Sequence, residues 1–212
     1  MKTPLYIFSI IILVLILFFV PFRILIFNES FYDYELDKLK VHEVMGKERA
    51  QNLTTQVLSY LRTGKGYLPD FNEREIRHLD DVKKLIDLYF VLGSLSILIF
   101  ILICYFFWKD KLFPKIFLFS GISALAIIFI FILMVKINFN LFFNYFHMIF
   151  FKPGTWVFNP ETEIIKQLFP NKFFEDFVIF HILDTALLSI ISILFSIIYK
   201  KTFKQRKNRK RK

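Results

Sequence analysis

Two histidines carry the chemistry that this 212-residue sequence suggests, because each shares a helical face with other polar residues. His78 lies in the charged stretch REIRHLDDV, with Glu75 and Asp81 three residues away on either side. Residues three apart on a helix are neighbours, and a carboxylate that contacts an imidazole orients it and raises its basicity. The stretch therefore predicts an imidazole that a neighbouring carboxylate orients and makes more basic. The alternative is a solvated charged turn at a membrane boundary.

The second histidine belongs to the aromatic run KINFNLFFNYFHMIFF, residues 136–151. Asn140, Asn144 and His147 follow one another at spacings of four and three residues, so a helix places them on one face. Polar groups are costly to leave facing lipid, and this face is expected to line a polar pocket near the lipid headgroups. The alternative is a helix at the membrane interface whose polar face contacts water.

The composition places these residues in a membrane protein. Hydrophobic residues make up 56% of the chain, with 30 phenylalanines, more than a soluble domain of this size needs for its core. Four segments reach the length of about 20 apolar residues that a spanning helix needs. They are 5–27, 88–108, 116–135 and 177–199. The first is too apolar and too long for a signal peptide and lacks a cleavage site. The predicted fold is an all-α membrane protein with four transmembrane helices.

The positions of the lysines and arginines predict the orientation. The loop around Lys111 and the tail 200–212 are strongly basic, which places both on the cytoplasmic side. Both termini are then cytoplasmic, and the two connections, 28–87 and 136–176, form partly helical extracytoplasmic segments. We treat residues 1–212 as a single integral membrane domain of a cell membrane.

Charge and cysteine content exclude other classes. Most of the net charge of +10 comes from the tail, which predicts attraction to anionic membrane lipids. The tail lacks interleaved aromatic residues, so no nucleic-acid partner is expected. The single cysteine, Cys104, excludes an intramolecular disulfide and a cysteine-rich zinc site.

The first connection contains two predicted helices. In HEVMGKERAQNLTTQVLSYLR, apolar residues recur every three or four positions, which predicts an amphipathic helix on the membrane surface, or alternatively one that packs on the protein. Asn72 with Glu75 forms an asparagine-headed capping box, so a helix is expected to begin near Glu73 and continue into the second span.

The second connection turns after His147. The stretch KPGTWVFNP provides a Pro-Gly turn and Trp156, a residue suited to the membrane-water boundary. Asn159 is predicted to cap a short helix that has Pro160 at its first position and ends at Pro170.

Two stretches together resemble a known family. REIRHLDDVKKLI and, two spans later, NYFHMIFFKPGTWVFNPETEIIKQLFPNKFFEDF are similar to bacterial lipoprotein intramolecular transacylases. The specific elements are HLxDV at 78–82 and FHxxFF, W-x-F-x-P and FP-x-x-FF between positions 146 and 174.

The resemblance implies an acyltransferase. Such enzymes move an acyl chain from the sn-2 ester of a diacylglyceryl-modified N-terminal cysteine to the α-amino group of that cysteine, which leaves a lyso-form lipoprotein. His78 and His147 would be the catalytic residues, one as general base and the other as general acid. The partners would be diacylglyceryl-modified lipoproteins and membrane lipids, and no ATP, metal or other cofactor is required. The motifs contain no serine elbow or catalytic cysteine, which favours direct attack by the amine.

Four further residues would support the reaction. Asp81 would orient His78, Arg77 would bind a carbonyl or a lipid phosphate, and Asn144 would donate to the oxyanion, with Trp156 as a further supporting or substrate-binding residue. The alternative is that aspartate and arginine form solvated pairs or bind headgroups.

Other functions fit the pattern less well. Two imidazoles and the Asp81 carboxylate suit zinc, but the tight spacing of a zinc motif is missing. His181 and Asp184, three residues apart in the fourth span, are expected to pair with each other, or alternatively to support the site. A non-catalytic accessory protein that binds a partner is the main rival, and a small transporter is disfavoured because the spans lack internal repeats.

Overall fold

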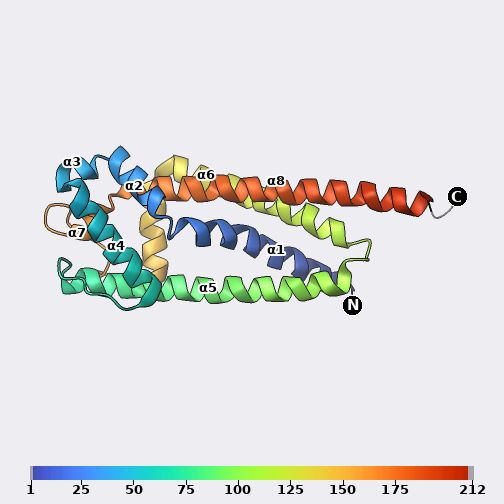
Figure 1. The fold of residues 1–212 in the computed structure, drawn as a ribbon, viewed down its shortest axis with the longest axis horizontal. Coiled ribbons are helices and arrows are strands. Elements are labelled where there is room, and N and C mark those ends of the chain that lie inside the picture. The colour runs from blue at the N-terminus through green and yellow to red at the C-terminus, as the bar shows by residue number, and fades with distance from the viewer. Residues whose placement is uncertain (1, 210–212) are drawn as a thin grey trace. The chain divides into compact units, whose positions relative to one another are not determined.

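The computed structural model describes residues 2–209, with side chains for residues 3–202. The described chain is 82% helical and has no strands (Figure 1). Its helices are α1 Lys2–Leu25, α2 Glu29–Lys38, α3 Val41–Met45, α4 Lys47–Thr63, α5 Glu73–Phe107, α6 Phe113–Phe150, α7 Ile164–Leu168 and α8 Asn171–Arg209. The prediction of an all-α membrane protein is confirmed.

Four of these helices are long and apolar enough to cross a membrane: α1, α5, α6 and α8. Each carries one of the four predicted spans, and α5 begins at Glu73 and continues through the second span, as the capping box predicts. The protein is therefore a multi-pass membrane protein. Of the predicted basic tail, residues 210–212 and the side chains from position 203 onward lie outside the described residues.

The chain divides into two compact units. The span unit contains the described residues of Met1–Arg23, Phe90–Ile132 and His181–Lys212, and the site unit contains Ile24–Tyr89 and Leu133–Phe180.

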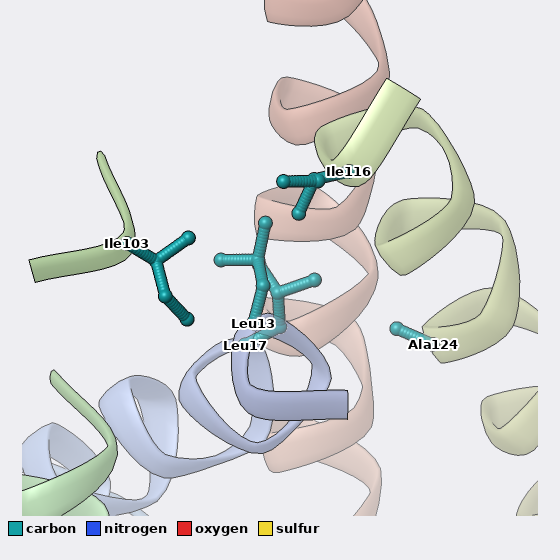
Figure 2. Packing of buried hydrophobic residues seen from close by; sticks show 5 residues of the cluster. All are labelled: Leu13, Leu17, Ile103, Ile116 and Ala124. Atoms are coloured by element: carbon teal, nitrogen blue, oxygen red, sulfur yellow. The ribbon is translucent and has the colours of Figure 1, made fainter. Parts of the chain in front are cut away.

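The span unit is held together by apolar packing and by hydroxyl groups. Figure 2 shows part of its core, which comprises Leu13, Leu17, Ile103, Ile116 and Ala124. Ser120 donates to the carbonyl of Ile10 at 3.1 Å, and Ser192 donates to that of Phe117 at 2.9 Å. In lipid each buried polar group needs a protein partner, so these bonds join neighbouring helices at little cost.

The site unit contains the shorter helices. α4 contacts α2, α3 and α7. The apolar side of α4 is buried there, and it comprises Ala50, Leu53, Val57, Leu58 and Leu61. These side chains are covered by protein, which corresponds to the packed alternative and not to a face that contacts lipid.

Two helix boundaries in the second connection differ from the simplest expectation. α6 is interrupted at Asn138, which has φ −165° and ψ 95°, and the Asn138 side chain accepts from the amide of Leu141 at 3.0 Å, so a new helical stretch starts there. The short helix predicted to start at Pro160 is five residues long and starts at Ile164. Its start is displaced because the Glu163 carboxylate accepts from the amide of Asn159 at 2.6 Å, which closes a turn instead.

Candidate active site

The two predicted catalytic histidines lie side by side in the site unit. His78 comes from the first turns of α5 and His147 from the last turn of α6. Their ring centroids are 6.0 Å apart and the rings are nearly parallel, with an angle of 23° between them. Each residue is only 7% exposed. Two separate sequence motifs thus contribute to one buried pair.

Aromatic rings surround the pair. Phe151 contacts both imidazoles, with ring centroids 5.0 Å from His78 and 5.1 Å from His147. Phe158 lies 5.2 Å from His78, and Trp156 lies 4.9 Å from His147. Such apolar surroundings disfavour a charged imidazolium, so both rings are suited to start the reaction neutral.

A backbone hydrogen bond defines the orientation of His147. Its Nδ1 atom lies 2.7 Å from the carbonyl oxygen of Phe143. Because a carbonyl oxygen can only accept, Nδ1 must carry the hydrogen, and the Nε2 lone pair remains able to take a proton. In the described part of the chain, His78 Nδ1 and Trp156 Nε1 are buried and make no hydrogen bond. Buried nitrogen atoms normally have partners, and exceptions concentrate at functional sites.

Glu75 anchors the start of α5. Its carboxylate accepts from the amides of Asn72 and of Ile165, both at 2.8 Å, and the Asn72 side chain accepts from the amide of Glu75 at 3.0 Å. The predicted capping box is therefore present. Glu75 is 1% exposed, and its carboxylate bonds to the backbone of α7, not to His78.

The four predicted supporting residues differ in their positions. Trp156 lies in ring contact with His147. Asp81 pairs with Lys84 at 3.0 Å, and Arg77 pairs with Glu73 at 3.5 Å. Arg77 and Asn144 are both exposed, and Asp81 is half-buried.

Arg74 and Glu163 form an ion pair next to the site that the sequence did not predict. The Arg74 guanidinium donates to both carboxylate oxygens at 2.6 Å, and also to the carbonyl of Val157 at 2.9 Å. Burial raises the pKa of the Glu163 carboxyl, but the hydrogen bond from Asn159 and the Arg74 guanidinium outweigh it, so that this pKa lies below its ordinary value. The pair joins residues 89 positions apart, and no local pattern signals such a contact.

Two other sequence hypotheses concern His181 and a metal. The His181 ring contacts Phe18 and Phe22, with centroids 6.1 and 5.9 Å away, and Asp184 is exposed. Among the described residues, no three His, Cys, Asp or Glu side chains are grouped so that they could hold a metal ion.

Comparisons with known proteins agree with the motifs. A family model described as lipoprotein intramolecular transacylase Lit matches residues 7–174. An uncharacterized protein of Aquifex aeolicus (strain VF5) is 30% identical over 135 residues, which are 63% of this chain and 60% of that protein. The match therefore covers less than two thirds of that relative.

Solved structures show the same fold. The membrane integral lipoprotein intramolecular transacylase Lit from Bacillus cereus superposes with a TM-score of 0.89 at 21% identity, over 97% of this chain and 98% of that chain. A histidine-to-alanine mutant of it gives a TM-score of 0.85 at 20% identity, over 97% and 96%. Together with the family match, this confirms the resemblance seen in the sequence and favours a transacylase, which is an acyltransferase, over an accessory protein.

Proposed function

Because the chain belongs to the lipoprotein intramolecular transacylase family, we propose that it moves an acyl chain within one diacylglyceryl-modified lipoprotein. The chain would pass from the sn-2 ester to the α-amino group of the N-terminal cysteine and leave a lyso-form lipoprotein. The observation that carries this proposal is the buried pair of His78 and His147, whose ring centroids lie 6.0 Å apart. The rings of Phe151, Trp156 and Phe158 form an aromatic enclosure around the pair.

The reaction is an ester aminolysis. The amine nitrogen forms a bond to the ester carbonyl carbon, the bond from that carbon to the glycerol oxygen breaks, and one proton passes from nitrogen to oxygen. The α-ammonium, with an ordinary pKa near 8, must first release a proton to become nucleophilic. The reaction needs proton transfers at two atoms, which imidazoles perform well near neutral pH, and it consumes no cofactor.

We assign the general base to His147. Its Nδ1 is fixed by the Phe143 carbonyl, so that Nε2 can take the proton from the attacking amine. His78, which stacks on it, would receive this proton in turn and deliver it to the departing glycerol oxygen, so that both imidazoles start and end the reaction neutral. The half-buried Asp81 carboxylate, close to His78 on α5, would stabilise the transient imidazolium.

The remaining roles concern the substrate. The aromatic rings around the histidines would exclude water that competes with the amine. Trp156, next to His147, would contact the acyl ester, and the exposed Arg77 and Asn144 would bind substrate carbonyls or lipid phosphates at the edge of the site.

The membrane arrangement is part of the proposal. Residues 1–212 would form one integral membrane domain with both termini in the cytoplasm, as the basic segments predict. The site unit would then face the outer leaflet, where lipoproteins and membrane lipids are its partners and nucleic acids are absent.

The test is to express the chain with a diacylglyceryl lipoprotein in a host that lacks N-acylating enzymes, and to sequence the N-terminal lipopeptide by mass spectrometry. We expect an N-acyl, S-monoacyl peptide from the wild type. His78→Ala and His147→Ala should each lose it while they remain in the membrane at normal levels.

The matched control is His42→Gln. His42 is also buried, but it lies beside Asp33 and Asp37, away from the aromatic enclosure, so product should persist. The proposal would be overturned if, in cells that express the wild type, the N-terminal peptides of several lipoproteins all remained diacylated with a free amine.

A further inference from the structure

The aromatic enclosure is built largely by one segment, the strap, which comprises residues 151–163 between α6 and α7. Three of its rings contact the imidazoles: Phe151, Trp156 and Phe158. The strap has no regular secondary structure apart from turns. Its position over the histidines must therefore be held by side-chain contacts.

The first half of the strap is held only by local bonds among the described residues. The amide of Thr155 donates to the carbonyl of Lys152 at 3.2 Å, and the Thr155 hydroxyl donates to the same oxygen at 2.8 Å. Gly154 adopts φ +82°, and a Cβ there would meet nothing within 4 Å. Apart from the ring contacts of Phe151 and Trp156, this half has no hydrogen bond within the described part of the chain that fixes the strap to α5.

The second half is fixed to α5 by Arg74. The guanidinium donates to both carboxylate oxygens of Glu163 and to the carbonyl oxygen of Val157, and it lies over the Phe158 ring at 5.1 Å. Glu163 in turn accepts from the amide of Asn159. One arginine thus connects three points of the strap to the helix that carries His78.

We propose that Arg74 and Glu163 are positioning residues whose ion pair keeps the strap closed and so decides whether the ester reacts with the amine or with water. This inference rests on the proposed function. Both residues act through Phe158 and Trp156, whose rings contact the histidines.

The two outcomes differ in one reactant. In transfer, the amine nitrogen bonds to the acyl carbon and the glycerol oxygen leaves with a proton. In hydrolysis, a water oxygen bonds to that carbon, the same glycerol oxygen leaves with a proton, and a free fatty acid forms. The histidines can serve either nucleophile, so exclusion of water from the enclosure determines the ratio of products.

The test measures both products from one sample. Purified wild type and Glu163→Gln in lipid nanodiscs receive a diacylglyceryl lipopeptide in ¹⁸O-labelled water, and mass spectrometry quantifies the N-acyl peptide and the labelled fatty acid. We expect the ratio of hydrolysis to transfer to rise about fivefold in Glu163→Gln, since one charged hydrogen-bond partner is lost. The conservative Arg74→Lys should raise this ratio less than Glu163→Gln does. The double variant with exchanged charges, Arg74→Glu with Glu163→Arg, should bring the ratio part of the way back to the wild-type value.

The matched control is Glu43→Gln, which removes the same charge from an exposed pair with Lys40 and should leave the ratio unchanged. Should Glu163→Gln fail to fold, Phe158→Leu tests the same strap without touching the ion pair, and its ratio should also rise. A parallel fall of both products in these variants, or an unchanged ratio, would overturn the inference. A wild type that makes no N-acyl peptide would instead overturn the proposed function.

Discussion

The span unit and the site unit satisfy their buried polar groups in different ways. In the span unit, serine hydroxyls donate to backbone carbonyls, as Ser120 does to Ile10 and Ser192 to Phe117. In the site unit, the buried contacts involve full charges, such as Glu163 with Arg74.

This difference follows from what each environment permits. Small hydroxyls can be satisfied within hydrocarbon without leaving a charge there, whereas ion pairs require the more polar environment expected of a connecting segment. Among the described residues, buried atoms without a hydrogen-bond partner occur in both units, such as His181 Nδ1 in the span unit and His78 Nδ1 in the site unit, so the contrast lies in the charges. The stability of the span unit and the chemistry of the site unit should therefore respond to different substitutions.

The largest effect should come from the histidine pair. His78→Ala and His147→Ala should each lower the rate of N-acyl formation by about 10²–10⁴, the contribution of general acid-base catalysis. The double variant should lose little more, since both groups act on one proton-transfer sequence. Single-turnover rates in nanodiscs check this, and multiplicative losses would show that the two histidines act independently.

Glu75→Ala should cost the most stability. It would leave the buried amide of Ile165 without an acceptor, at about 1–3 kcal/mol, and would also remove the acceptor of the exposed Asn72 amide, at a smaller cost. Unfolding by denaturant in micelles measures the loss, and transacylation should fall with it. Glu75→Gln keeps an acceptor oxygen and should lose clearly less, and equal losses would show that the two hydrogen bonds are not the cause.

Gly121→Ala tests the span unit. A Cβ at this position would lie 2.6 Å from the backbone oxygen of Ser189 and from Ile193, so the helices must separate, at about 1–3 kcal/mol. Thermal unfolding in micelles should show the loss, while the ratio of hydrolysis to transfer stays at the wild-type value. The neighbouring exposed Ile122 gives the control Ile122→Ala, and a similar loss there would argue against the close approach.

Acid should weaken the site unit through Glu163. Because the folded pKa of this carboxyl is lowered, its stabilising effect is present above the unfolded value of about 4.3 and is lost as pH falls through the folded pKa. Stability measured from pH 6 to pH 3 should therefore decline less steeply in Glu163→Gln than in the wild type. Identical slopes would mean that the ion pair contributes nothing.

Ser192→Ala should have the smallest effect. Hydrogen bonds between membrane helices contribute about 0.6 kcal/mol on average, and the Phe117 carbonyl keeps its helical partner. Unfolding in micelles should detect a change below that of Gly121→Ala. If Ser192→Ala lost more free energy of unfolding than Glu75→Ala, the hydroxyl bonds of the span unit would matter more for stability than the carboxylate bonds of the site unit, contrary to our expectation.

Local patterns predicted those parts of the structure that depend on neighbours in the sequence. Hydropathy located the four spanning helices, and the spacing of Asn72 and Glu75 located the start of α5. The face with His147 was visible because helical periodicity is local. That its partner would be His78 rested on a resemblance, since spacing alone does not show which faces meet.

Long-range polar contacts could not be predicted in this way. Glu75 was read as a possible partner of His78, yet its carboxylate bonds to the amide of Ile165. The start of α7 differs from the predicted start at Pro160 because Glu163 contacts Arg74 and Asn159. In both cases the carboxylate binds a group that is distant in the sequence, and the local spacing does not show that contact.

The hydrogen bond from Ile165 to Glu75 also has a consequence for biosynthesis. It closes a loop of 90 residues, so the start of α5 and the start of α7 cannot meet until most of the chain has been made. A nascent chain that ends before Ile165 therefore lacks this link between α7 and the helix that carries His78. The strap lies between these two helices, so its far end is joined to α5 only after α7 has been made, and chains that end before α7 should not carry out efficient acyl transfer.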